Sequence, residues 1–541
     1  MAPDIPLQEV SRAKKAEREE RLARRPEWRL RTKVPPGLTD VSALPTSQLS
    51  PREYEIVHLD ATALTDAIRA RRYTAVEVLE AFCHVATIAQ DLTNCLTEVL
   101  FEEGLRRARE LDRHLAETGQ VVGSMHGVPV SIKDHILVKG HDTATGYAAW
   151  AFRTVAAKDA VVVDVLRKAG AVIYVKTANP QTLLSLETNN NIYGRTLNPH
   201  NRALTPGGSS GGESALIAVH GSPLGVGTDI GGSIRIPAAY MGLYGLKGSV
   251  GRMPHAGLMG SHDGMDAIVG ALGPLATSAR DLALFARVML EHEPWLACRT
   301  SSPLPSFGMT AWWRHTRPSA PPSRARDALL AAGHDVIDWE PVDHQVAWDL
   351  ILKLYFLDGG AEYREVLAQD PPVPQTQWIM DQVPNGGRPY GIDEVFKINL
   401  EREAFRAKVL AHWHAHTART KSGRTVDTVL SPVAATLAPR HDATRWWGYT
   451  SYWNLMDYPA VVFPVGRFRA AGHAAAADAG AVDEPRNETE RAVRAEWDPA
   501  TYDGIPVSLQ LVGKRLNEER LLGMLGRVED ALARFPGEGA H

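Results

Sequence analysis

Apolar positions recur with helical spacing from about residue 57 onward. The segments ATALTDAIRARR, TAVEVLEAFCHVATIAQ and RARELDRHLAE carry this pattern. Short apolar runs at 128–132 and 171–176 are typical of strands, and a helical segment at 158–170 separates them. The alternation recurs at VDTVLSP, AVVFPV and VSLQLVG. It predicts an α/β fold with one large domain, in which a central mixed, mostly parallel twisted β-sheet is covered by helices on both faces.

Two segments depart from this pattern. Residues 11–25 read SRAKKAEREERLARR, which predicts a short charged helix, and a proline-rich stretch follows. We interpret residues 1–56 as an N-terminal charged helical arm and linker that packs on the main body or on a neighbouring subunit. Residues 57–541 form the main domain. Within it, 468–500 are rich in Ala, Gly, Asp and Glu and predict a surface insertion.

Composition excludes several classes of protein. The chain has 541 residues, 44% hydrophobic and 23% charged, with a net charge of -4, so neither nucleic acid nor an anionic membrane is expected as the main partner. It shows no apolar run of about 18 residues and no secretory pattern near its start. The cysteines Cys83, Cys95 and Cys298 are too few for a disulfide framework. We therefore expect a cytoplasmic protein with reduced thiols.

The most unusual composition lies between residues 205 and 237. Glycine clusters at 207–212 and 227–233 flank an apolar, helix-like segment. Such clusters let the backbone turn sharply or approach a ligand closely. A phosphate-binding P-loop would need a lysine after the cluster, and none stands there. The dinucleotide fingerprint also fails, because its third glycine would fall on Ile230.

A site for acyl transfer explains these residues better than either nucleotide-binding motif does. The run Ile230-Gly231-Gly232-Ser233 combines main-chain N–H donors with a hydroxyl nucleophile. Serine needs a base to take its proton. The histidine-dependent G-x-S-x-G elbow is absent, because Arg235 occupies its second glycine position. From this block alone, the base stays unidentified.

Three motifs together resemble the amidase signature family. They are GGSSGGE at 207–213, the pattern G-x-G-x-D-x-G-x-S-I-R-x-P at 225–237, and HGVPVSIKDHI at 126–136. LTNCLTEVL, KAGAVIYVKTANPQTLLSLETNNNIYGRTLNP and GIPVSLQLVGKRLNEERLL are similar as well. The resemblance is closest to the fungal acetamidase branch and covers nearly the whole chain, including the charged arm.

The resemblance implies a catalytic triad of Lys133, Ser209 and Ser233. Lys133 directly follows a predicted buried strand, where loss of solvation should lower its pKa and keep the amine neutral. Neutral Lys133 would then take a proton from Ser209, which takes one from Ser233. The family holds the bridging serine with a cis peptide, expected here between Gly208 and Ser209.

The resemblance also implies roles for the neighbouring residues. The N–H groups of Ile230, Gly231, Gly232 and Ser233 form the oxyanion hole. Thr228 and Gly207 are interpreted as structural. The supporting positions brace the loop or add a hydrogen bond; they are Gly208, Ser210, Asp229 and Arg235.

The function that follows is hydrolysis of a carboxamide C–N bond through an acyl-enzyme. Acetamide-like or aryl-acetamide substrates are the first choices, with no metal and no organic cofactor, and the family suggests a homodimer. The same triad could open esters, carbamates or amino-acid amides, or serve a pathway-specific tailoring amidase. The charged arm argues against the transamidosome glutaminase branch. A non-catalytic binding subunit is disfavoured, because no triad position is mutated.

Several other sequence features have no role in the predicted mechanism. His412 and His416 form an i, i+4 pair without a carboxylate partner, so a solvated helix face is favoured over zinc. The aromatic stretch 445–459 fits either core packing or a wall of the acyl pocket. Roles for His441 and Asp442 are left open. Gly248 stands where the family commonly has proline, which predicts a looser loop behind the site.

Overall fold

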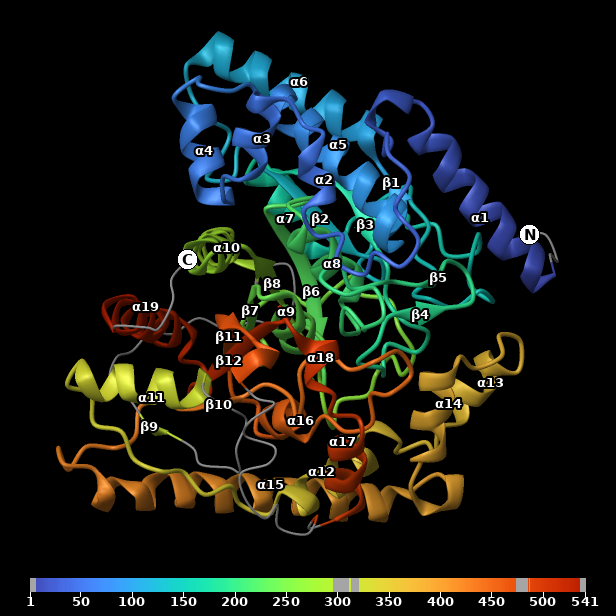
Figure 1. The fold of residues 1–541 in the computed structure, drawn as a ribbon. Helices are drawn as coiled ribbons and strands as arrows, with labels where there is room; N and C mark the ends of the chain where they lie inside the picture. The colour runs from blue at the N-terminus through green and yellow to red at the C-terminus, as the bar shows by residue number, and fades with distance from the viewer. Residues whose placement is uncertain (1–5, 295–310, 313–320, 473–484, 486, 536–541) are drawn as a thin grey trace.

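The computed structural model describes residues 6–294, 311–312, 321–472, 485 and 487–535. A twisted sheet runs through the middle of the molecule with helices around it (Figure 1). Its ten strands lie in the order β1-β3-β2-β6-β8-β7-β11-β12-β10-β9. Their bounds are β1 (Leu96–Val99), β2 (Pro129–Lys133), β3 (Val172–Thr177), β6 (Leu224–Asp229), β7 (Tyr244–Lys247), β8 (Ala271–Ala276), β9 (Ala311–Trp312), β10 (Val429–Pro432), β11 (Ala460–Arg467) and β12 (Pro506–Val512). A separate hairpin joins β4 (Asn189–Asn190) to β5 (Gly194–Arg195).

Parallel pairing is concentrated where the functional motifs lie. Strand β2 pairs in parallel with both β3 and β6, and β9 pairs in parallel with β10. The other neighbouring pairs of this sheet, as far as the structure describes it, are antiparallel. The α/β class and the mixed sheet agree with the sequence prediction, but the sheet has more antiparallel pairs than expected. Strand β8 inserts between β6 and β7, and a pattern of alternating elements carries no information about such an order.

The helices of the first half of the chain begin and end at recognisable signals. In α5 the side chain of Thr74 accepts from the N–H of Glu77 in a capping box, and Asn94 ends the helix in the left-handed conformation. The helices of this half are α1 (Leu7–Leu22), α2 (Leu44–Ser47), α3 (Pro51–Val57), α4 (Ala61–Arg69), α5 (Ala75–Thr93), α6 (Phe101–Thr118), α7 (Val161–Lys168), α8 (Gly211–Ala218), α9 (Arg235–Met241) and α10 (Ala279–Glu291).

The helices of the second half include the long α15, which crosses the bottom of Figure 1. They are α11 (Pro321–Ala331), α12 (His344–Tyr355), α13 (Ala361–Leu367), α14 (Pro374–Asp381), α15 (Ile392–Ala415), α16 (Gly448–Leu455), α17 (Glu488–Ala495), α18 (Pro499–Tyr502) and α19 (Glu518–Arg534).

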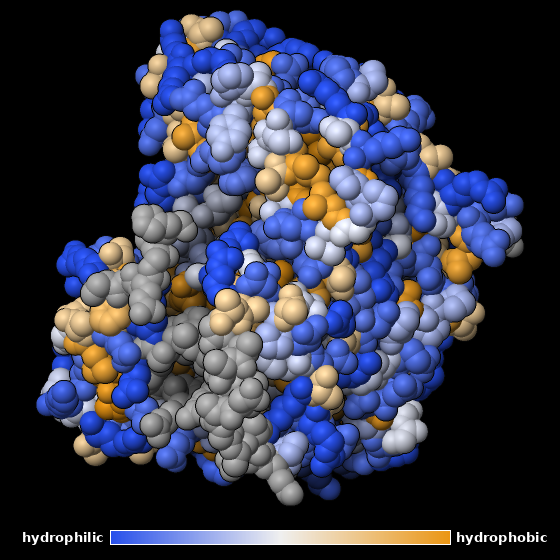
Figure 2. Space-filling view, viewed as in Figure 1, coloured by the Kyte–Doolittle hydropathy of each residue, from blue (hydrophilic) through white to orange (hydrophobic). Residues whose placement is uncertain are grey.

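The sheet separates two hydrophobic cores. Along β11, Val461 and Phe463 join the core formed with α5, α10 and α19. The alternate residues Ala460 and Val462 join the core formed with α9, α12, α15 and α16. Successive strand residues face opposite sides of a sheet, so this division shows that helices cover both faces. On the face shown in Figure 2, hydrophilic residues predominate and apolar ones form small patches.

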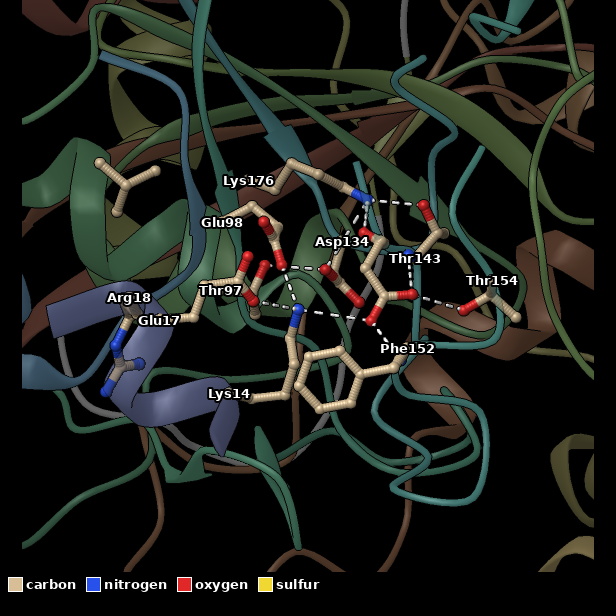
Figure 3. A network of polar contacts seen from close by, with 12 residues as sticks. Lys14, Glu17, Arg18, Thr97, Glu98, Asp134, Thr143, Phe152, Thr154 and Lys176 are labelled. Atoms are coloured by element: carbon tan, nitrogen blue, oxygen red, sulfur yellow. Dashed lines mark hydrogen bonds and ion pairs between the residues drawn. The ribbon is translucent and has the colours of Figure 1, made fainter. Parts of the chain in front are cut away.

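Helix α1 lies against the body of the same chain and buries a lysine there. The Lys14 Nζ lies 2.6 Å from Glu98 Oε1 and 3.3 Å from Asp142 Oδ2 (Figure 3). Lys176 extends the network to Asp134, because its Nζ donates to the Asp142 carbonyl oxygen at 2.9 Å and lies 3.8 Å from Asp134 Oδ1. Because Asp134 directly follows the last residue of β2, the network connects the arm to the strand that carries the predicted base.

Replacing Lys14 with methionine should test this anchor. The change keeps the length of the side chain but leaves buried carboxylates without one of their cations, which costs about 3–5 kcal/mol. We expect the midpoint of thermal unfolding to fall clearly, measured by calorimetry. The matched control is Lys168→Met, which removes an exposed ion pair with Asp164 that is worth about 0–1 kcal/mol. Equal shifts for the two variants would contradict the buried anchor.

Two predictions fall partly outside the described residues. Within the predicted insertion at 468–500, residues 473–484 and 486 are not described, whereas α17 and α18 are. Cys298 is also outside, and Cys83 and Cys95 are buried free thiols.

Among the helices that the structure describes, none combines the length and the apolar character that crossing a bilayer requires.

Candidate active site

Lys133 is buried at the end of β2, between β3 and β6. Its side chain has no solvent exposure, and its Nζ lies 2.6 Å from Ser209 Oγ and 3.0 Å from Thr228 Oγ1. Burial lowers the pKa of Lys133 to about 7, although the charges of Asp229 and Glu213 act in the opposite direction. An amine with this pKa can be neutral near physiological pH and accept a proton.

Ser209 faces Lys133 from the loop that precedes α8. The peptide bond between Gly208 and Ser209 is cis, as the sequence analysis expected. Glycine is needed at 208, because a Cβ there would lie 2.5 Å from the Ser185 carbonyl oxygen and 2.6 Å from the Glu187 nitrogen. The predicted lysine and bridging serine therefore meet at hydrogen-bond distance, although 76 positions separate them in the chain.

The carboxylate of Asp229 organises the loop between β6 and α9. It accepts hydrogen bonds from the N–H of Gly232 at 2.8 Å and of Ile234 at 3.1 Å. Arg235 forms a fully buried ion pair with it, with Nη2 and Oδ1 2.9 Å apart. Burial alone would raise the pKa of Asp229, but the charge and hydrogen bonds of Arg235 outweigh it and hold this pKa well below its usual range. These contacts of Asp229 and Arg235 hold the loop in place.

Hydrogen bonds to four successive carbonyl groups set the orientation of this loop. Asp229 C=O accepts from Asn454 at 3.2 Å, and Ile230 C=O accepts from the Tyr355 hydroxyl at 2.8 Å. Gly231 C=O accepts from the Thr450 hydroxyl at 2.6 Å, and Gly232 C=O accepts from the N–H of Ile236 at 2.7 Å. Three of the donors are the side chains of Tyr355, Thr450 and Asn454. The fourth is a main-chain N–H in the first turn of α9.

These carbonyl groups determine where the next N–H points. In a planar trans peptide, the C=O of one residue and the N–H of the next point in opposite directions. The amides of Ile230, Gly231 and Ser233 are therefore directed away from the groups that bond the preceding carbonyl oxygens. The amide of Gly232 differs, because it donates to Asp229. Of the four predicted oxyanion donors, the Gly232 amide therefore already has a side-chain acceptor.

Ser233 lies beside the bridging segment. Its carbonyl oxygen accepts a hydrogen bond of 3.2 Å from the N–H of Ser210, which gives Ser210 a supporting contact through its main chain. Ser209 and Ser233 are 2% and 4% exposed, so both hydroxyls are nearly buried. Among the hydrogen bonds of the described residues, none joins Ser209 Oγ to Ser233 Oγ. The structure therefore places Lys133 beside Ser209, and the main chain of Ser233 beside that of Ser210.

Comparison with known proteins places this arrangement in a family. A family model described as Amidase matches residues 77–522. The chain belongs to the amidase family. Two acetamidases are similar along most of their length. The one from Aspergillus oryzae is 39% identical over 500 residues, covering 88% of this chain and 90% of the relative. The one from Emericella nidulans is 37% identical over 535 residues, covering 93% and 94%.

Solved structures agree with this family assignment. A fatty acid amide hydrolase superposes with a TM-score of 0.89 at 30% identity, covering 97% of this chain and 95% of that one. A bacterial aryl acylamidase of the amidase signature family, at 19% identity and a TM-score of 0.66, shows the fold alone. The resemblance stated from the sequence, the α/β amidase fold and an amide-hydrolysing enzyme are thereby confirmed.

Several residues that hold the amidase site were missed or underestimated from the sequence. Thr228, interpreted as structural, places its hydroxyl on the Lys133 amine. Glu213 closes the family motif GGSSGGE but was given no role. It accepts from the hydroxyls of Ser131 and Thr177, and burial raises its pKa to about 7. Only its place in the motif could have indicated it. Tyr355 and Thr450 lie more than 100 positions away, and no local pattern marks them.

The aromatic stretch 445–459 of the amidase packs in the core and also contacts the nucleophile loop. Tyr452 and Trp453 are buried in the core. Trp447 belongs to the same core and also reaches the loop of the nucleophile, where a Cβ on Gly231 would lie 3.0 Å from its Nε1. The same Trp447 ring packs against Trp348 and Trp378 with centroid distances of 5.1 and 5.6 Å. Glycine at 231 therefore lets an aromatic wall approach the backbone closely.

His441, Asp442 and the loop after Gly248 form no hydrogen bond with Lys133 in the described part of the chain. His441 Nδ1 lies 3.0 Å from the buried carboxylate of Glu187, which also accepts from the N–H of Asp442. These two residues support the segment that packs on Gly208. The loop after Gly248 is held in place, since the N–H of Val250 donates to Asp457 at 2.7 Å.

The two helix histidines take part in packing. The ring of His416 stacks on Trp339 with a centroid distance of 4.8 Å, and His412 Nε2 lies 2.8 Å from the Glu340 carbonyl oxygen.

Proposed function

We propose that this amidase hydrolyses small carboxamides through Lys133, Ser209 and Ser233. The observation that carries the proposal is the buried Lys133 amine, 2.6 Å from Ser209 Oγ with a pKa of about 7. Neutral Lys133 takes the proton of Ser209 as Ser209 takes that of Ser233, and Ser233 Oγ attacks the amide carbon. The proton returns through Ser209 to the leaving nitrogen, and ammonia or an amine departs. Water then hydrolyses the acyl-enzyme by the same relay.

The developing oxyanion is stabilised by main-chain amides. We assign this role to the N–H groups of Ile230, Gly231 and Ser233. The Gly232 amide, expected to take part, is occupied by the Asp229 carboxylate and acts by holding the loop. Donors fixed before the reaction need no reorganisation as charge develops, and removing one such donor typically costs about 10²–10³-fold in kcat.

The names of the relatives support the substrate class. Two of them are acetamidases that match most of this chain. Trp447 beside Gly231 supplies a flat apolar wall close to the nucleophile, which suits a short acyl group or an aryl ring. We therefore propose acetamide-like and aryl-acetamide substrates. The homodimer and the cytoplasmic location stay predictions.

Ammonia release from a panel of amides tests this function. The panel contains acetamide, propionamide, phenylacetamide and a long-chain fatty amide, with the methyl esters of the same acids as comparison. We expect turnover of the short and aryl amides, and weaker turnover of the long-chain amide. Esters cleaved in preference to every amide would favour the esterase alternative. No turnover of any amide would refute the proposal.

Tyr355→Phe tests how the oxyanion donors are held. The change removes only the hydroxyl that bonds Ile230 C=O, so the next N–H loses its fixed direction. We expect kcat to fall roughly tenfold with little change in KM, less than the loss of a whole donor. Steady-state kinetics with a short amide measures it. Tyr54→Phe, at a 49% exposed tyrosine, is the matched control. Unchanged kcat in Tyr355→Phe would contradict the orienting role.

A further inference from the structure

A second hydrogen-bonded chain reaches the Lys133 amine, in addition to its contact with Ser209. The ring of His135, only 5% exposed, lies two residues after Lys133. Its Nδ1 lies 3.0 Å from the Met259 carbonyl oxygen, and its Nε2 lies 2.8 Å from Thr228 Oγ1. Thr228 Oγ1 is also 3.0 Å from Lys133 Nζ. The order of the chain is therefore Met259, His135, Thr228 and Lys133.

The direction of every hydrogen bond in this chain follows from its first member. A carbonyl oxygen can only accept, so Nδ1 of His135 carries a proton. In a neutral imidazole the other nitrogen, Nε2, is then an acceptor. The Thr228 hydroxyl must donate its only proton to Nε2, which leaves its oxygen lone pairs for the amine. Lys133 consequently donates an N–H to Thr228.

This direction matters because a neutral amine has a single lone pair. If the Thr228 hydroxyl were free to rotate, it could donate its proton to that lone pair and compete with Ser209. With the hydroxyl turned toward His135, the lone pair is left for the proton of Ser209. We propose that His135 is a positioning residue of the general base, acting through Thr228 to direct the Lys133 lone pair at Ser209. This inference rests on the proposed function.

The charges around His135 support the neutral ring that the chain requires. Burial is the main cause that holds the pKa of His135 well below its usual value, and Lys133, His255 and Lys176 lower this pKa further when they are protonated. The adjacent Asp134 carboxylate bonds to Thr97 and to the N–H of Thr145. On the other side, the charged groups facing Lys133 are Asp229 and Glu213.

Two substitutions separate this role from simple packing. His135→Leu removes the acceptor, whereas the amide of His135→Gln can present its oxygen to Thr228 and its nitrogen to Met259. We expect His135→Leu to lower kcat about tenfold or more with KM nearly unchanged, and His135→Gln to restore most of it. The matched controls are His414→Leu and His414→Gln at an exposed histidine of α15. Equal losses in the two His135 variants would overturn the inference.

The pH profile gives a readout that packing would not move. An acceptor oxygen at Thr228 stabilises the ammonium form of Lys133, whereas a donating hydroxyl stabilises the neutral amine. In His135→Leu the acidic limb of kcat/KM should therefore shift to lower pH, although the maximum rate falls. An unchanged limb, or a shift to higher pH, would count against the proposal.

A double-mutant cycle with Thr228→Val completes the test. If His135 acts only through Thr228, adding His135→Leu to Thr228→Val should change kcat less than about twofold. Fully multiplicative losses would overturn the inference. If the wild-type enzyme hydrolyses amides and His135→Leu has the same kcat, the positioning role of His135 is refuted and the proposed function is not. If the wild-type enzyme hydrolyses no amide, the proposed function itself fails.

Discussion

Ser233→Ala is expected to lower kcat/KM for amides by about 10⁴-fold or more, because the variant has no atom that can form the acyl-enzyme. The fold should persist, since the hydrogen bonds of the loop around residue 233 use main-chain atoms and other side chains. Ammonia release and a thermal melt measure the two properties. Ser47→Ala, at an exposed serine of α2, should match the wild-type enzyme. Near-normal turnover by Ser233→Ala would exclude this serine as the nucleophile.

A covalent label can locate the nucleophile directly. A fluorophosphonate should add one group to the wild-type chain and none to Ser233→Ala. Trypsin cuts after Arg202 and Arg235, so the segment 203–235 is released as one peptide that contains both Ser209 and Ser233. Fragmentation of that peptide in the mass spectrometer must place the label on Ser233. A label on Ser209 would exchange the roles of the two serines.

Lys133→Met should produce the second large effect. It removes the base but keeps an unbranched side chain of similar length, and loss of general-base catalysis typically costs about 10²–10⁴-fold. In the wild-type enzyme, kcat/KM should fall as the pH drops through the Lys133 pKa of about 7, because the protonated amine cannot accept a proton. Above that pH the amine is neutral and the rate should level off. In Lys133→Met, the fall of kcat/KM at low pH should be absent.

The leaving group offers an internal control for Lys133→Met. An amide nitrogen must be protonated before it departs, whereas a nitrophenolate leaves without a proton. The variant should therefore lose much more activity toward a short amide than toward the nitrophenyl ester of the same acid. Equal losses toward both substrates would show that the lysine supports the structure of the site and does not transfer protons.

The sequence predicted the residues of the site better than their surroundings. The motifs around Lys133, Ser209 and Ser233 are local, so their spacing and the family resemblance could indicate them together. The lowered pKa of Lys133 followed from a charged residue placed at the end of an apolar strand. The sequence could not show that the Gly232 N–H is already hydrogen-bonded, because this depends on the side-chain orientation of Asp229.

Contacts between distant segments explain most of what was missed. Tyr355 and Thr450 meet the nucleophile loop because α12 and α16 pack beside it, and periodicity places a helix but not its neighbour. The position of β8 between β6 and β7 is likewise a property of the sheet and not of any one strand. His135 was visible in the motif HGVPVSIKDHI, but its role depends on Thr228 and Met259, which lie far along the chain.

The support of the nucleophile loop from remote helices limits how this enzyme can be redesigned. Grafting residues 225–237 onto another scaffold would transfer the serine and its glycines without the side chains that aim their amides. Conversely, substitutions at Tyr355 of α12 or Thr450 of α16 would remove hydrogen bonds that hold the loop carbonyls, and by the proposed mechanism they would also affect the chemical step. If the proposed function holds, we expect substrate range and turnover to change together in such variants, and a directed-evolution library at these helices should be screened for both.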